Sequence, residues 1–121
     1  MISAVLFAIN HPKLAEFYSK TLSVPRTAAD THHSVLSFNG FELVIHQRPP
    51  GGGAAPRSQP VRRESAALRL DFVVDDIAAA RRVAASLGGR VDEAAPPWAA
   101  GERLCLGHDP EGNVFLLKER G

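Results

Sequence analysis

The residues best suited to chemistry in this 121-residue chain are histidines, acids and one arginine. Glu42 and His46 lie on one apolar stretch, and Arg69 and Asp71 lie on another. Imidazole and carboxylate groups bind zinc, and a histidine near an aspartate can also act as a general base. A guanidinium group suits a carboxylate or phosphate, or an internal ion pair with a nearby acid. These residue types leave metal binding, acid–base catalysis and anion binding open.

Two halves of the chain repeat one order of elements, which must position these side chains. Asn10 and Asp76 each follow an apolar strand and can cap the helix that comes next. Asn39-Gly40 is a strong hairpin signal, and Gly112 stands before the last apolar run. Each half therefore reads as strand, helix and three strands. The expected strands cover residues 2–9, 27–30, 34–38, 41–47, 68–74, 90–93, 103–107 and 113–118.

Helical spacing of apolar residues predicts the buried face of each helix. Strand residues alternate between two faces, so every second residue is expected to face away from the helices. His11, at the start of the first helix, is expected to be exposed. The residues expected on the buried helical faces are Leu14, Phe17, Tyr18 and Leu22 in the first helix, and Ile77, Ala80, Val83, Ala84 and Leu87 in the second.

Composition limits the classes of function. Fourteen basic and thirteen acidic residues give a formal charge of +1, which argues against a nucleic-acid partner. The basic cluster Arg57, Arg62 and Arg63 is expected to be a solvated part of a connector. Cys105 is the only cysteine, so no intrachain disulfide can form, and its leucine neighbours favour a small packed residue. The apolar N-terminal run is too short to span a bilayer, so no membrane contact and a cytoplasmic location are expected.

The length predicts one domain over residues 1–121. Module one is expected at 1–48 and module two at 67–121. A connector rich in proline, glycine and arginine lies between them at 49–66. A connector of this length is unusual inside a compact domain, so it is either a linker between the halves or a flap over their seam.

Three motifs together resemble the vicinal oxygen chelate superfamily, which includes glyoxalase I, bleomycin-resistance and fosfomycin-resistance proteins and extradiol dioxygenases. They are Phe17-Tyr18, the run Phe-Val-Val-Asp-Asp-Ile at 72–77, and Asp-Pro-Glu-Gly-Asn at 109–113. The resemblance implies an α+β fold of two tandem βαβββ modules. These would form a cupped, barrel-like mixed sheet with helices outside. It also implies a homodimer, since family members often pair.

The resemblance further implies a divalent metal at four inward positions. Two of these precede the capping residues by seven positions and are Ser3 and Arg69; the closing strands contribute Val44 and Leu116. Serine is a weak ligand, valine and leucine are none, and arginine repels a cation. We therefore expect no metal and no cofactor. The alternative is a metal-dependent lyase, isomerase or dioxygenase with displaced ligands, such as zinc held by His46, Asp71 and Glu42.

Without a metal, the expected cup is half apolar with a few polar groups, which suits a small organic molecule, with an anionic group as one option. Trp98, in an apolar insertion at 94–100, either stacks on the ligand or packs at a seam. A metal-free enzyme with His46 as general base, and an interaction module with a vestigial cup, remain open. The predicted ligand contacts are Phe7, Glu42, His46, Arg69, Asp71, Trp98 and Lys118.

Overall fold

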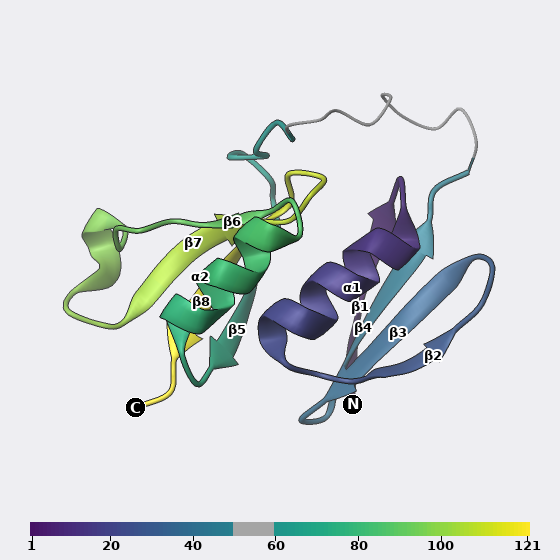
Figure 1. Ribbon diagram of the computed structural model, residues 1–121, viewed down its shortest axis with the longest axis horizontal. Helices are drawn as coiled ribbons and strands as arrows, with labels where there is room; N and C mark the ends of the chain where they lie inside the picture. The colour runs from purple at the N-terminus through teal and green to yellow at the C-terminus, as the bar shows by residue number, and fades with distance from the viewer. Residues whose placement is uncertain (50–59) are drawn as a thin grey trace. The chain divides into compact units, whose positions relative to one another are not determined.

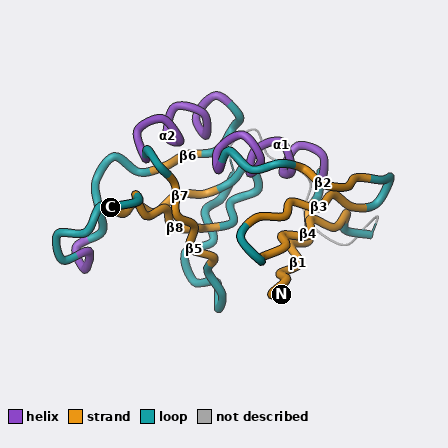
Figure 2. The backbone as a smooth tube through the Cα atoms, turned by 90° about the horizontal axis from the view of Figure 1, so that it is seen from below, coloured by secondary structure: helices purple, strands orange, loops and turns teal. Residues whose placement is uncertain are grey.

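The computed structural model describes residues 1–49 and 60–121 (Figure 1). The chain divides into two compact units, one on each side of residues 50–59. Each unit is a four-stranded mixed sheet with its helix on one face (Figure 2). The linker or flap expected at 49–66 falls largely outside the described residues, as does Arg57. None of the helices in the described ranges combines the length and apolar character needed to cross a bilayer.

Module one has the predicted order of one strand, one helix and three strands. Its elements are β1 (Ile2–Ala8), α1 (His11–Leu22), β2 (Arg26–Ala29), β3 (His33–Phe38) and β4 (Phe41–Gln47). The sheet order is β1-β4-β3-β2, with β1 parallel to β4 and the other pairs antiparallel. Asn10 caps α1 by accepting a hydrogen bond from the backbone N–H of Lys13 at 3.2 Å. Asn39 and Gly40 turn β3 into β4 with φ angles of 50° and 75°.

Module two repeats this order with one added 3₁₀ turn. Its elements are β5 (Leu70–Val74), α2 (Ile77–Ser86), β6 (Arg90–Val91), η1 (Pro97–Ala99), β7 (Leu104–His108) and β8 (Val114–Glu119). The sheet order β5-β8-β7-β6 matches that of module one. Asp76 caps α2 by accepting from the N–H of Ala79 at 3.1 Å. The two predicted βαβββ modules are confirmed, with element ends that differ by one or two residues.

The core of each module lies between its helix and its sheet. In module one, the four apolar residues predicted on α1 are all buried, and they share this layer with Leu36, Leu43 and Ile45. In module two, Ile77, Ala80 and Ala84 are buried, while Val83 and Leu87 are half-buried. Successive strand residues alternate in burial, as in β1 and β4. The second face of each sheet is therefore left for other contacts.

The expectation that His11 is exposed is wrong. Its side chain is 4% exposed, and its ring contacts Ser34 Oγ through Nδ1 and the Thr31 carbonyl through Nε2, both at 3.1 Å. Its backbone N–H donates to Gln47 Oε1 at 3.0 Å. The start of α1 lies against the beginning of β3, so the imidazole joins helix and sheet.

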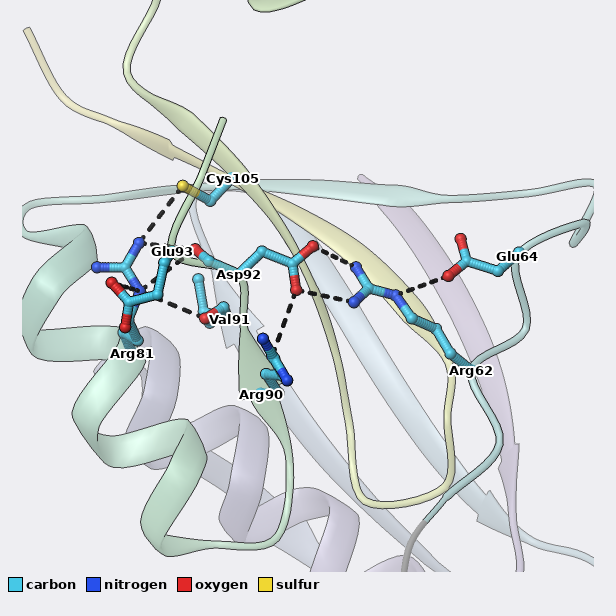
Figure 3. A network of polar contacts seen from close by, with 8 residues as sticks. All are labelled: Arg62, Glu64, Arg81, Arg90, Val91, Asp92, Glu93 and Cys105. Atoms are coloured by element: carbon cyan, nitrogen blue, oxygen red, sulfur yellow. Dashed lines mark hydrogen bonds and ion pairs between the residues drawn. The ribbon is translucent and has the colours of Figure 1, made fainter. Parts of the chain in front are cut away.

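The expectation that Arg62 is solvated is also wrong. Its guanidinium donates to both carboxylate oxygens of Asp92, at 2.8 and 3.0 Å, and its side chain is 19% exposed (Figure 3). Glu64 and Arg90 extend this ion-pair network at 3.3 and 3.6 Å. The N–H of Arg63 also donates to the carbonyl of Gly112 at 2.9 Å. The described end of the expected connector is therefore fastened to module two.

Cys105 is buried, as predicted for a small packed residue. Its sulfur lies 3.4 Å from Nη2 of Arg81, which also donates to the carbonyl of Asp92 at 2.8 Å (Figure 3). The cysteine therefore belongs to the packing between α2 and its sheet.

Candidate functional site

The face of the first sheet that points away from α1 carries three rows of side chains. Strands β1, β4 and β3 contribute one residue each to every row, because their pairing places these residues side by side. Val5 and Phe7 on this face are 53% and 59% exposed. The rows are polar (Ser3, Glu42, Ser37), apolar (Val5, Val44, Val35) and aromatic (Phe7, His46, His33). We call this surface the open face of module one.

The polar row is linked by hydrogen bonds across the strands. Ser3 donates from Oγ to Oε1 of Glu42 at 3.4 Å. The hydroxyl oxygens of Ser37 and Thr27 lie 3.0 Å apart, so β2 joins the same network. The carboxylate of Glu42 accepts further bonds readily, since ionised carboxylates are acceptors only. It could orient a donor group on a ligand.

The aromatic row fixes the tautomer of one histidine. Nδ1 of His46 lies 2.8 Å from the carbonyl oxygen of Gln47, which can only accept. The neutral ring therefore carries its proton on Nδ1, and Nε2 is the acceptor. The ring of His33 lies nearly parallel to that of His46, at 12° and 6.2 Å between centroids. Phe7 contacts the other side at 5.8 Å, so a short aromatic surface forms.

Asp30 holds the second histidine of this row. Its Oδ1 lies 2.9 Å from Nδ1 of His33 and accepts from the backbone N–H groups of His32 and His33. These backbone bonds, together with the nearby imidazoles, lower the pKa of Asp30 below its usual value. The carboxylate is therefore ionised at neutral pH and anchors the ring of His33.

In module two, Arg69 and Asp71 form a bidentate ion pair. Arg69 directly precedes β5, and Asp71 lies within it. Nε and Nη2 of Arg69 donate to the two oxygens of Asp71 at 2.7 and 2.9 Å. This bond raises the pKa of Arg69. The guanidinium also lies over the ring of Trp98, at 5.5 Å from its centroid. The interpretation of Arg69 as half of an internal ion pair is therefore realised within this module.

The segment around η1 covers part of the same face. Ala99 packs with Leu104, Leu106 and Leu116, and the side chain of Leu116 is 3% exposed. Lys118, one strand position further along this face, lies 3.6 Å from Oε1 of Glu102. The insertion thus packs against its own sheet, while Trp98 itself remains 55% exposed.

The sequence comparison shows the family. The model of the glyoxalase-like domain family matches residues 3–117. The chain belongs to the glyoxalase-like domain family. The family and the fold together agree with the vicinal oxygen chelate superfamily expected from the motifs. No curated protein matches the sequence significantly.

Solved structures of glyoxalase-like proteins share the fold. A glyoxalase/bleomycin resistance protein from Albidiferax ferrireducens T118 aligns at TM-score 0.72 and 18% identity, over 100% of this chain and 98% of that one. A family enzyme from Burkholderia phytofirmans PsJN aligns at 0.71 and 14%, over 97% and 95%. A variant of the fosfomycin resistance protein of Listeria monocytogenes, complexed with Mn(II) and 1S,2S-dihydroxypropylphosphonic acid, aligns at 0.66 and 11%, over 99% and 87%. These identities support the fold alone.

The four positions at which the resemblance implies a metal carry poor ligands for a cation in this chain. Ser3 donates its hydroxyl to Glu42, and Val44 has no donor atom. Arg69 brings a positive charge that Asp71 already balances, and Leu116 is buried beneath Ala99. A divalent ion needs several imidazole or carboxylate ligands that converge. Within residues 1–49 and 60–121, no group of three or more histidine, cysteine, aspartate or glutamate side chains is placed to hold one.

The predicted contacts fall into two sets. Phe7, Glu42 and His46 share the open face of module one. Arg69, Asp71, Trp98 and Lys118 belong to module two, where each contacts a neighbour in its own module. The sequence prediction that both sets meet around one ligand stays a prediction, and so does the zinc site that would combine His46 with Asp71.

Sequence reasoning missed His33, Val35 and Ser37 on the open face of module one. A two-residue turn at Asn39-Gly40 fixes the register of the hairpin, so that Phe38 pairs with Phe41 and His33 with His46. Counting back from that turn would have placed β3 beside the predicted residues of β4.

Proposed function

We propose that this glyoxalase-like protein is a metal-free binding protein for a small organic molecule. The exposed apolar and aromatic rows on the open face of module one carry this proposal. Val5 and Phe7 offer apolar contact there, with His46 in the aromatic row and Glu42 in the neighbouring polar row as polar anchors. Pockets for small ligands typically combine apolar walls with a few polar groups that fix orientation.

The unsuitable donors at the family metal positions support the metal-free part of the proposal. Only Ser3 among the four has an oxygen that could contact an ion. We therefore assign recognition to apolar contact and hydrogen bonding. In this assignment, Nε2 of His46 accepts from a ligand donor, and Phe7 packs against the ligand's apolar part.

A thermal-shift screen with untagged protein and a library of small organic molecules tests ligand binding. A specific ligand at a hundredfold excess over its dissociation constant should stabilise the chain by about 2.7 kcal/mol. Phe7→Ala and His46→Ala should weaken that effect while keeping the native circular dichroism spectrum. His32→Ala is the matched control, because His32 is exposed and lies outside the three rows. A library without any stabilising compound would favour an interaction module instead.

Elemental analysis of the same preparation tests the absence of a metal. We expect less than stoichiometric zinc, nickel, manganese and iron. One bound ion per chain would contradict the proposal and favour the alternative, a metal-dependent lyase, isomerase or dioxygenase with displaced ligands.

We also propose that the protein is a homodimer, which light scattering coupled to gel filtration would measure. A mass of one chain, 13.0 kDa, at micromolar concentration would contradict this.

A further inference from the structure

We propose that Arg69 is a preoriented anchor for an oxyanion, a carboxylate, phosphate or phosphonate group of the ligand. This inference rests on the proposed function, because it gives the bound molecule a charged group. Two contacts hold the guanidinium in place: Asp71 takes one edge through Nε and Nη2, and Trp98 lies against one face at 5.5 Å. The side chain nevertheless stays 37% exposed.

The guanidinium of Arg69 has N–H groups that Asp71 does not use, and these can bind an oxyanion. Arginine has five N–H donors in a planar fork, and Asp71 uses two of them. The remaining three belong to Nη1 and Nη2, and two of these form the end fork that suits two oxygens of one oxyanion. In the described ranges, the contacts of Arg69 are those with Asp71 and Trp98. Among the described residues, no acceptor is bound to the end fork.

The turn that carries Trp98 is held in place by contacts within module two. Trp98 belongs to η1, between Pro97 and Ala99, and the N–H of Ala99 donates to the carbonyl of Pro96 at 3.0 Å. Ala99 is buried against Leu104 and Leu116. The backbone that carries the indole beside Arg69 is therefore positioned without a ligand.

Charge sets the strength of such a site. Asp71 neutralises Arg69, so an oxyanion gains two directed hydrogen bonds and little net attraction. Small anions alone should therefore bind weakly, and the rest of the organic ligand must add affinity. An ion pair with only a structural role would show no saturable response to an oxyanion.

The chain offers its own reporter, because Trp98 is its only tryptophan. Titration with inorganic phosphate, methylphosphonate and acetate, each against sodium chloride at equal ionic strength, should change its fluorescence saturably. Comparing the three probes distinguishes a phosphorus oxyanion from a carboxylate. Arg69→Lys should weaken binding by about tenfold or more, because an ammonium group lacks the fork. Arg103→Lys, which alters a pair with Glu119 in the same module, should leave affinity within about twofold, inside the spread for surface charges.

Trp98→Phe keeps an aromatic face and removes the fluorescence signal, so its binding is read by thermal shift. Retained anion stabilisation in Trp98→Phe, together with its loss in Arg69→Lys, supports the inference. Equal responses of Arg69→Lys and the parent protein would overturn it, as would the absence of any saturable response. If the anions give no saturable response while uncharged organic compounds still stabilise the chain through Phe7, the proposed function stands and the anchor fails. If only the anions bind, the anchor stands and the apolar site fails.

Discussion

Gly112 and Gly40 occupy equivalent turns of the two modules, yet substitution by alanine should lower the free energy of unfolding much more at Gly112. Both have positive φ angles, 86° and 75°, so alanine is strained at either position. Around Gly40 nothing lies within 4 Å of an added Cβ. At Gly112 the Cβ would overlap the carbonyl oxygen of Val61 and lie 2.9 Å from its carbonyl carbon. The substitution therefore tests whether the segment around Val61 packs on module two.

The expected loss of stability follows from three contributions. The left-handed conformation costs a non-glycine residue about 1–2 kcal/mol, and both variants should show this cost. Gly112→Ala must also push the backbone of Val61 away, which breaks the bond from the N–H of Arg63 to the carbonyl of Gly112, about 0.5–1.5 kcal/mol. Disturbance of the Arg62–Asp92 pair adds a similar amount, about 0.5–1 kcal/mol. We expect the free energy of unfolding to fall by about 2–4.5 kcal/mol in Gly112→Ala and by about 1–2 kcal/mol in Gly40→Ala.

Urea unfolding monitored by circular dichroism and by Trp98 fluorescence measures both free energies of unfolding. An Arg62→Ala change should then cost less in the Gly112→Ala background than in the parent, since the first substitution has already displaced the segment. Equal losses for the two glycine variants would refute the packing of Val61 on the turn. Additive effects of Gly112→Ala and Arg62→Ala would refute the coupling.

Three further predictions concern buried or half-buried side chains. His11→Ala should lower the free energy of unfolding by about 1–3 kcal/mol, measured in urea, because it removes a partner of Ser34 inside the core. Burial and the nearby Arg62 lower the pKa of His108 below 6.5. As pH falls below 6.5 the unfolded chain takes up a proton before the folded chain does, so the free energy of unfolding should decrease. His108→Gln should flatten this pH dependence, and His32→Gln should not. Leu116→Ala should lower the free energy of unfolding, measured in urea, by about 2–4 kcal/mol, because Leu116 is buried against Ala99. Val44→Ala on the open face should lower it by about 1 kcal/mol.

Local signals in the sequence were sufficient for the elements and for the duplication. Asn10 and Asp76 cap the two helices as predicted, because a capping side chain needs only the backbone three residues ahead. Asn39 and Gly40 adopt the positive φ angles that their turn requires. Alternation placed Val5 and Phe7 on the exposed face of β1. In each case, the cause and its effect lie within a few residues.

Contacts between distant residues were beyond this reasoning. His11 was expected in solvent, but Thr31 and Ser34 enclose it from another element. Arg62 looked like a connector residue, and only the fold brings it to Asp92. In both cases a polar side chain is buried because a partner far along the chain satisfies its hydrogen bonds, and no local pattern reports such a partner.

The two modules share one order of elements but differ in what covers the second face of each sheet. In module one this face carries exposed apolar and aromatic side chains, with Val44 half-buried. In module two the insertion at 94–100 supplies Ala99, which buries Leu116, and Trp98, which carries Arg69. The four positions at which the resemblance implies a metal are unsuitable for different reasons in the two modules. Ser3 and Val44 in module one are a weak ligand and no ligand, while in module two Leu116 is buried against Ala99 and Arg69 carries a positive charge. Module one therefore presents apolar contact and module two a directed guanidinium, and that one organic anion uses both stays a prediction.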